Sequence, residues 1–267
     1  MSKFRILPAW KILPTGSFAS NIQYMLEFLR KRLIRRTAIT ASAVVCVLSG
    51  TAGVANAATG TVNTAGAPLT VRAAPGSGYD GWTTKADGAS VTILCQTTGS
   101  SVTGTYGTSN IWDMISNGGF VSDAYVYTGS DGTVAHACAR AGSPPRANPR
   151  GQDAAISYEF ARLGSTAEEG WCMRFQAQAY GWSASGFSTA EVGGDWMVSH
   201  GYMHTSGIPP RGALVWYHNS SGTGHIVVSL GEGMVVGSSV PNKIGVAGYQ
   251  YRTGYRGWSL PYFPVAA

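Results

Sequence analysis

The chain has 267 residues, of which 44% are hydrophobic and 12% are charged, so it can form one large or two modest domains with a real core. Its formal net charge of +6 is uneven, because residues 1–57 hold eight of the 19 Lys and Arg residues and one of the 13 Asp and Glu residues. The remainder, with 11 basic and 12 acidic residues, has a net charge of −1. This distribution argues against nucleic-acid binding, since the basic charge belongs to a segment that we expect to be removed.

Residues 1–57 have the pattern of an export signal. Basic residues at 30–36 precede the uncharged, mildly apolar stretch 37–54, and Ala55-Asn56-Ala57 supplies the small residues of a cleavage site. The stretch is rich in Ala, Thr, Ser and Gly, which makes it weakly hydrophobic for a stable membrane span. We therefore expect cleavage after Ala57, secretion to the cell wall or the extracellular space, and no stable membrane anchor.

Three cysteines, Cys95, Cys138 and Cys172, follow the expected cleavage site. Thiols tend to pair in the oxidising compartments that exported proteins reach, and an odd number leaves at least one of them free. Cys95 and Cys138 fall in one expected domain, whereas Cys172 lies beyond a proline-rich segment. A Cys95–Cys138 bridge with Cys172 free is therefore favoured, although the sequence leaves the other two pairings open.

Residues 58–138 are expected to form an all-β domain. Short runs of β-branched and aromatic residues at 69–72, 90–94 and 119–126 are separated by turn formers. Several short strands at this spacing predict a small barrel.

The sequences LTVRAAPGSGY, GASVTILCQ and IWDMISNGGFVSDAYV in this part of the chain resemble bacterial SH3-like domains. The resemblance implies binding of peptidoglycan or its cross-bridges, with a purely structural barrel as the alternative. Trp82, Trp112 and Tyr125 are candidate exposed aromatics for such binding, and each is equally compatible with a place in the core.

Residues 139–152 contain three prolines and no apolar periodicity, which predicts an extended linker. After it, residues 153–267 have helical patterns at 154–163 and 172–180, and Ser165-Thr166 with Glu168-Glu169 resembles the start of a helix. Strands are expected at 212–217, 225–230 and 234–239. Helices followed by antiparallel strands predict an α+β domain, so the expected fold is multidomain, an SH3-like barrel followed by an α+β domain.

Cys172 lies near the start of the second expected helix, where unpaired backbone N–H groups favour a thiolate over a thiol. His225 opens an apolar strand directly after Gly224. A free cysteine at a helix start that faces a histidine on a sheet is the arrangement of papain-like nucleophilic catalysis. The alternatives are a cysteine that is simply a small buried hydrophobe and a histidine that caps the edge of the sheet.

The histidine of such a pair needs an orienting group. The register of the hairpin after His225 predicts which residue lies opposite it and could take this role. A two-residue turn at 231–232 would place His225 opposite Ser238, and a three-residue turn at 231–233 would place it opposite Ser239. Less well placed candidates are Glu232 and Asn242.

The sequences GWCMRFQAQAYGW, IPPRGALVWYH, GTGHIVVSLGEGMVV and YRGWSLPYFP are similar to CHAP amidases and NlpC-type peptidoglycan endopeptidases, two related papain-like families. The resemblance spans about residues 153–264. It implies that Cys172 is the nucleophile and His225 the base, with no metal or cofactor, and the groove is expected to include Trp171, Tyr158 and Trp182. Those families place His, Asn, Gln, Asp or Glu in the third position, where this chain has Gly237-Ser238-Ser239.

These patterns predict a monomeric, secreted peptidoglycan hydrolase that cleaves wall-peptide amide bonds, as an N-acetylmuramoyl-L-alanine amidase or as a peptide endopeptidase. One alternative is a non-catalytic cell-wall-binding protein with a degenerate hydrolase fold. Another is a metal hydrolase, because His200 and His204 have i, i+4 spacing, but Gly201 between them disfavours a helix.

Overall fold

The structure, a computed structural model, describes residues 57–267, and all of them belong to one compact unit. The expected export signal lies outside the described residues, apart from its last residue, Ala57. Among residues 57–267, the helices are all too short or too polar to cross a membrane.

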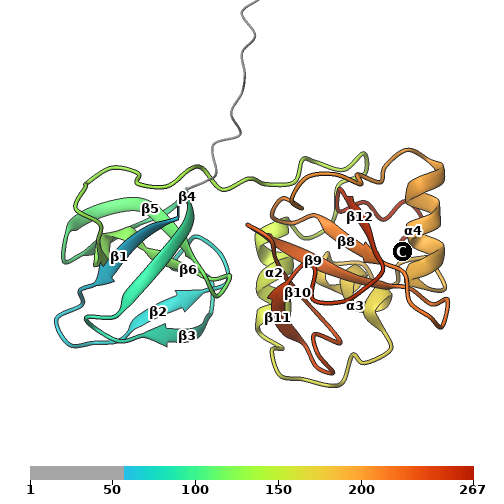
Figure 1. Cartoon of the computed structure of the whole chain (residues 1–267), viewed down its shortest axis with the longest axis horizontal. Helices are drawn as coiled ribbons and strands as arrows, with labels where there is room; N and C mark the ends of the chain where they lie inside the picture. Colours follow the sequence, from blue (N-terminus) through green and yellow to red (C-terminus); the bar gives the residue numbers. More distant parts are fainter. Residues whose placement is uncertain (1–56) are drawn as a thin grey trace, which may run out of the picture. The chain divides into compact units, whose positions relative to one another are not determined.

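The first sheet has seven antiparallel strands in the order β3-β2-β6-β5-β4-β1-β7, drawn in blue to green in Figure 1. Its interior is apolar and includes Val71, Ile93 and Val121. The start of β4 alternates buried and exposed residues, as a half-buried strand requires. The elements are β1 (Ala58–Val62), β2 (Leu69–Arg72), β3 (Gly81–Lys85), β4 (Ser90–Gly104), β5 (Gly107–Ile115), β6 (Phe120–Ser122), the 3₁₀ turn η1 (Asp123–Tyr125) and β7 (Val126–Tyr127).

The aromatic residues that this sheet exposes are not the three that the sequence offered as candidates for wall contact. Trp112 is only 2% exposed, and its Nε1 donates a 2.9 Å hydrogen bond to the Ser100 carbonyl, so it belongs to the core. Trp82 and Tyr125 are half-buried, whereas the exposed aromatics are Tyr106 and Tyr127. Sequence alone could not separate these cases, because an aromatic residue suits either face of a strand.

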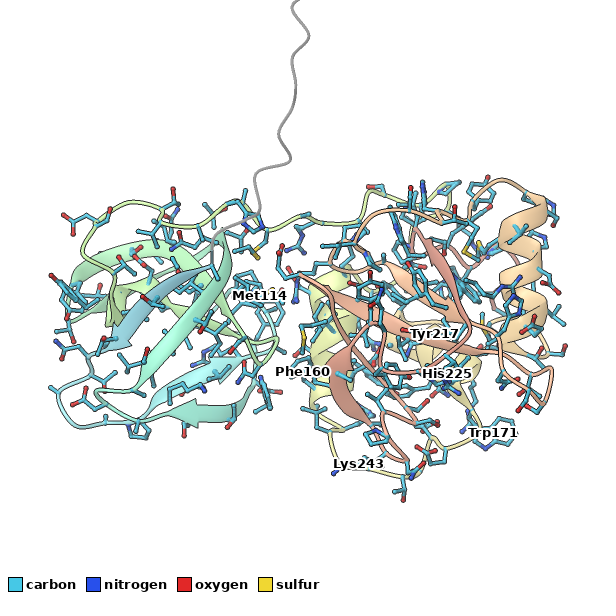
Figure 2. The ribbon with its side chains drawn as sticks, in the orientation of Figure 1. Met114, Phe160, Trp171, Tyr217, His225 and Lys243 are labelled. Carbon is cyan, nitrogen blue, oxygen red and sulfur yellow. A yellow bond between two sulfur atoms is a disulfide. The ribbon has the colours of Figure 1, made fainter. Side chains whose placement is uncertain are left out.

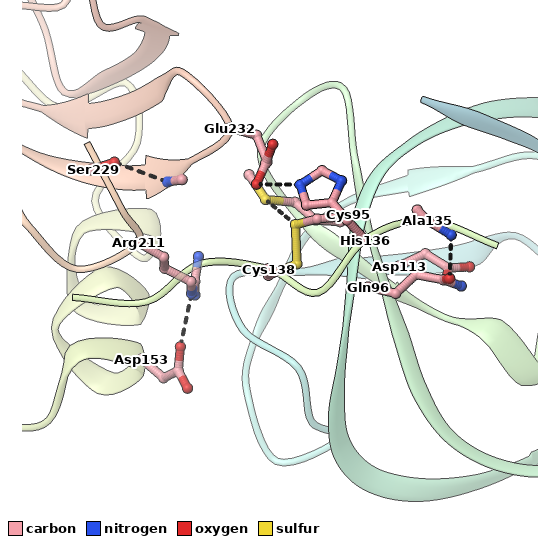
Figure 3. The surroundings of a disulfide bond; sticks show 12 residues. Cys95, Gln96, Asp113, Ala135, His136, Cys138, Asp153, Arg211, Ser229 and Glu232 are labelled. Carbon is pink, nitrogen blue, oxygen red and sulfur yellow. Dashed lines mark hydrogen bonds and ion pairs between the residues drawn. A yellow bond between two sulfur atoms is a disulfide. The ribbon is translucent and has the colours of Figure 1, made fainter. Parts of the chain in front are cut away.

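A disulfide joins Cys95 of β4 to Cys138, 43 residues further along the chain (Figure 3). Cys172 is a free thiol. The favoured pairing is therefore confirmed. Beside the bridge, the Gln96 Oε1 accepts hydrogen bonds from the backbone N–H groups of Val134 (2.6 Å) and Ala135 (2.9 Å). The bridge and this carboxamide together fix the segment that follows β7 against β4.

Residues 139–141, at the start of the expected linker, are hydrogen-bonded to the backbone of Arg211. The N–H of Ala141 donates to the Arg211 carbonyl (2.7 Å), and the N–H of Arg211 donates to the Ala139 carbonyl (3.0 Å). The buried Arg211 guanidinium donates to the Asp153 carboxylate at 3.0 Å (Figure 3) and to the Ala73 carbonyl at 2.8 Å. A buried cation is stable only with such partners, so Arg211 determines the course of the chain here.

The second sheet has five antiparallel strands in the order β11-β10-β9-β8-β12. Alternate residues such as Trp216 and Ile226 share a core with the helices, whereas Tyr217 and Val227 point to the opposite face and pack with tyrosines from residues 249–255. Both faces are thus covered, which explains why every residue of β9 is buried. The elements are α2 (Gln152–Phe160), α3 (Cys172–Ala179), α4 (Ala190–Ser199), β8 (Leu214–Tyr217), β9 (His225–Gly231), β10 (Met234–Gly237), β11 (Gly245–Gly248) and β12 (Tyr255–Ser259).

The helix α4 and the strands β11 and β12 were not expected from the sequence. In α4, the Thr189 hydroxyl caps the first turn by accepting from the Val192 N–H, and Gly193 and Gly194 occupy the middle. A Cβ atom on Gly193 would lie 3.1 Å from the Trp216 ring, and one on Gly194 would lie 2.5 Å from the Arg256 guanidinium. These glycines, which favour a loop in the sequence, are therefore present because the helix packs closely.

Candidate active site

Cys172 is the first residue of α3, which packs against β9. The preceding residues 165–170 form turns instead of the helix start that their sequence resembles. Glu168 there pairs with Arg174 at 3.0 Å, and Gly170 has a φ of 78° that favours glycine. The thiol is consequently held at the start of a helix, as the sequence predicted.

His225 is the first residue of β9 and is only 3% exposed. It pairs with Tyr217 of β8, which lies beside it in Figure 2. The centroids of the two rings are 6.0 Å apart. The residue before it, Gly224, has a φ of 65°, and a Cβ atom there would lie 2.5 Å from the Glu191 backbone nitrogen. Only glycine fits this approach, so Gly224 allows α4 to lie against the start of β9.

Cys172 and His225 line the same cavity, which has a volume of about 800 Å³. Trp171, 55% exposed at the mouth, also lines it, and so do residues 183–190 between α3 and α4. Arg252 comes from the segment between β11 and β12. A cavity of this size suits a peptide or small-molecule ligand.

The environment of Cys172 favours a neutral thiol. Burial raises the pKa of the Cys172 thiol above its usual value, and this effect exceeds the opposing effects of nearby groups. Hydrogen bonding from the backbone N–H groups of Ile226 and Met173 and the positive charge of Arg252 act in the opposite direction. Desolvation of the sulfur therefore opposes the thiolate that the sequence suggested at this helix start.

The imidazole of His225 is also neutral. Burial, with a smaller contribution from the positive charge of Arg252, lowers the pKa of His225 to about 3. Its Nε2 atom is buried and has no hydrogen-bond partner. A neutral histidine can accept a proton, but an unpartnered ring nitrogen leaves the orientation of the imidazole to packing alone.

The two serines that were candidates for orienting His225 do not bond to it. The turn of the hairpin is Glu232-Gly233, and a bulge follows Met234. If β10 continued in the register that it has after the bulge, Ser239 would lie opposite His225. However, β10 ends at Gly237, and the Ser239 N–H and Oγ both donate to the Glu169 carboxylate. The Ser238 hydroxyl is buried without a partner.

The remaining sequence candidates lie elsewhere. Tyr158 stacks with the Arg162 guanidinium, which is 3.5 Å from its ring centroid, and it does not line the cavity. Trp182 does not line it either, since its Nε1 donates to Asn148 and Arg146 covers its ring at 4.0 Å. Of the three expected groove aromatics, the structure therefore places only Trp171 beside Cys172.

Other polar candidates are engaged outside the cavity. Glu232 lies 3.2 Å from His136, and His200 and His204 stack on Trp196 and Trp258. Within residues 57–267, no three His, Cys, Asp or Glu side chains are grouped closely enough to hold a metal ion.

Sequence reasoning missed Arg252 and Glu169 as residues of this region. Neither stands in a recognisable motif, because their proximity to Cys172 arises from the return of the chain after β11 and from the turn before α3. The position of Glu169, three residues before Cys172, was the one feature of the sequence that could have indicated its proximity to the site.

No protein-family model matches the chain. Two proteins of Bacillus subtilis (strain 168), the uncharacterized proteins YraJ and YraI, are each 47% identical to it over 87 residues. The match covers 29% of this chain, 74% of YraJ and 73% of YraI.

Among solved structures, NlpC2 from Trichomonas vaginalis is similar with 15% identity and a TM-score of 0.30, over 79% of this chain and 74% of that one. An NlpC/P60 family protein from Bacillus cereus ATCC 10987 has 14% identity and a TM-score of 0.31, over 78% of this chain and 64% of that one. These TM-scores are too low to establish a common fold.

Proposed function

Over the matched 87 residues the chain belongs to the family of Bacillus subtilis YraJ and YraI, and we propose that it is a secreted cysteine hydrolase of peptidoglycan. The bond cleaved is an amide of the wall peptide, as in an N-acetylmuramoyl-L-alanine amidase or a peptide endopeptidase. The proposal includes an export signal at residues 1–57, an SH3-like barrel at 58–138, a linker at 139–152 and a hydrolase domain at 153–267.

One observation carries the proposal. A free cysteine at the start of a helix and a histidine at the start of a strand line one cavity that is large enough for a peptide. An exported protein has little reason to keep a free thiol, since oxidising compartments favour disulfides. Here the other two cysteines of the described residues are paired, and the third lines the same cavity as the His225 imidazole.

The mechanism follows from the neutral state of both groups. As the sulfur of Cys172 attacks the amide carbonyl, the thiol proton passes to His225, which burial holds unprotonated and so able to accept it. The carbonyl oxygen becomes an oxyanion, which backbone N–H groups beside the sulfur stabilise.

The imidazolium then gives this proton to the leaving amine as the carbon–nitrogen bond breaks, and a thioester remains on Cys172. Water attacks the thioester with His225 again as the base, which releases the acid and restores the thiol. No step requires a metal ion or an organic cofactor.

The barrel would hold the enzyme at its substrate. Tyr106 and Tyr127 are its exposed aromatic residues, and their rings lie 5.7 Å apart. Aromatic side chains at a surface supply contact area for a wall peptide or glycan. Tethering a binding module to a hydrolase raises the local substrate concentration.

A second candidate function is wall binding without catalysis, and the lack of a hydrogen-bond partner for the His225 Nε2 atom favours it. This atom is buried without a partner, whereas an efficient Cys-His pair has a third group that orients the imidazole. Without that group, the chain would bind peptidoglycan through the same surfaces and release no products.

Incubation of the purified chain with peptidoglycan tests the proposal, with the Cys172→Ala variant as its matched control. We expect soluble fragments whose masses identify the cleaved amide bond, and no such fragments from the variant. Identical fragments from both proteins would refute the cysteine mechanism. Retention of both proteins on sedimented peptidoglycan without any fragments would instead support the wall-binding function.

A further inference from the structure

Arg252 is an unpaired cation in the cavity of Cys172. It is half-buried and lines the cavity with Cys172 and His225, and no Asp or Glu of residues 57–267 lies within ion-pair distance of it. Arg174, the other arginine of the cavity wall, pairs with Glu168 at 3.0 Å and stacks over Trp171 at 4.3 Å. Arg252 therefore differs from Arg174 in lacking an anion.

The groups around Arg252 leave its guanidinium available. The rings of Tyr217 and Tyr251 have their centroids 5.9 Å from the guanidinium carbon, and the Tyr251 hydroxyl, which is close enough to interact with Arg252, supplies no negative charge. Glu169, the carboxylate of this region, already accepts two hydrogen bonds from Ser239. The guanidinium thus has donors that the protein itself does not fully use.

The charge of Arg252 reaches the reacting groups. Arg252 lines the same cavity as Cys172 and His225. Its positive charge opposes the effect of burial on the pKa of the Cys172 thiol and lowers the pKa of His225. An anion bound to Arg252 would consequently share the cavity with the carbonyl that Cys172 attacks.

We propose that Arg252 is a carboxylate-binding site, and that the substrate carries a free carboxylate close to the amide bond that Cys172 cleaves. A guanidinium binds a carboxylate through two parallel N–H···O bonds, and such charged hydrogen bonds are the strong ones in a partly buried site. This inference rests on the proposed hydrolase function and adds the substrate class, acidic peptides whose carboxylate is not amidated.

Alkylation of Cys172 tests the site without requiring any hydrolysis. Iodoacetate and iodoacetamide transfer similar groups to the sulfur with loss of iodide, but only iodoacetate carries a carboxylate. The measurement is the ratio of their second-order rate constants at Cys172, followed by peptide mapping in the full chain. Because both reagents need the same thiolate, the ratio cancels any change in the pKa of the thiol.

We expect Arg252→Gln to lower the iodoacetate-to-iodoacetamide ratio by about tenfold, the size of one charge-assisted hydrogen bond. Arg252→Lys retains the positive charge and should give an intermediate ratio. Such a ratio would show that the effect of Arg252→Gln comes from the lost guanidinium and not from misfolding. Arg174→Gln is the matched control from the same cavity and should leave the ratio within about twofold of the original, because Arg174 is already paired. A wild-type ratio in both Arg252 variants would overturn the proposal.

Hydrolysis of paired peptides separates this inference from the function on which it rests. A peptide with a free carboxylate near the scissile bond should have a higher kcat/KM than its amidated analogue, and Arg252→Gln should remove the difference. If peptidoglycan is cleaved but the alkylation ratio does not depend on Arg252, the carboxylate site is wrong and the hydrolase stands. If the ratio depends on Arg252 but nothing is cleaved, the anion site stands and the hydrolase is wrong.

Discussion

Ser239 holds the Glu169 carboxylate through two hydrogen bonds, one from its backbone N–H (2.9 Å) and one from its hydroxyl (2.7 Å). Glu169 lies three residues before Cys172, and Ser239 lies two residues after the end of β10. The pair therefore links the hairpin that follows His225 to the turn that places Cys172. Ser239 stabilises the position of the nucleophile and does not orient the histidine.

Replacement of Ser239 by alanine should lower the free energy of unfolding by about 1–2 kcal/mol, because a hydrogen bond to a charged acceptor is lost. Ser238→Ala is the matched control, since its buried hydroxyl has no partner and its removal should change stability by less than about 0.5 kcal/mol. Urea unfolding at neutral pH measures both. Equal effects of the two substitutions would contradict the assigned role of Ser239.

The rate of Cys172 alkylation by iodoacetamide should increase with pH well into the alkaline range. Burial raises the pKa of the thiol, so the thiolate fraction at neutral pH is smaller than in an unfolded cysteine. The rate at pH 7 should therefore be lower in the folded chain than in the same chain in urea, and it should rise about tenfold per pH unit below the pKa. A rate that is constant between pH 5 and pH 8 would instead indicate a resting thiolate–imidazolium pair.

Replacement of Glu159 by glutamine should stabilise the protein above about pH 5. Glu159 of α2 is fully buried, which raises the pKa of its carboxyl well above the usual value, and the neighbouring Gln176 of α3 offsets only part of this effect. The folded state keeps the proton while the unfolded state loses it above about pH 4.3, so stability falls as pH rises between the two pKa values. The slope is about 1.4 kcal/mol per pH unit.

The difference in unfolding free energy between Glu159→Gln and the original chain should therefore grow from pH 4 to pH 7. Glu168→Gln is a suitable control, because that carboxylate lies in a surface ion pair with Arg174. A difference that stays constant over this range would show that the Glu159 carboxyl ionises normally in the folded protein.

Removal of the disulfide by Cys95→Ala and Cys138→Ala should lower the free energy of unfolding by about 4 kcal/mol. The bridge closes a loop of 43 residues, and the chain entropy of such a loop in the unfolded state accounts for this magnitude. Thermal or urea unfolding measures the effect. Cys172→Ala, which leaves the bridge intact, should cost much less, so a similar loss in both proteins would argue against the bridge as the source.

Local sequence was sufficient for the elements that carry the reacting pair. The helix at 172–180 and the strands at 225–230 and 234–239 differ from α3, β9 and β10 by two residues or fewer at each end. The number and spacing of the cysteines also favoured the observed bridge. These features depend on periodicity, turn residues and chain proximity, all of which are local properties.

Packing overrode local signals in α4 and at the hairpin. Gly193 and Gly194 favour a loop, yet they occupy a helix that packs closely against Trp216 and Arg256, where a Cβ atom would be crowded. The bulge after Met234 gives a register that would bring Ser239 opposite His225, but β10 ends at Gly237, and the backbone of Ser239 is left-handed, with its hydroxyl bonded to Glu169. A hairpin register can be counted along the sequence, but a bulge that changes it cannot.

The sequence by itself determined that a free cysteine at a helix start and a histidine at a strand start are present, because both depend on local patterning. Only the tertiary structure decided which side chains surround them: Trp171 rather than Tyr158 or Trp182, together with Arg252. It also decided the protonation of the pair, since burial raises the pKa of one group and lowers that of the other. Desolvation depends on residues far apart in the chain, and no local pattern encodes it.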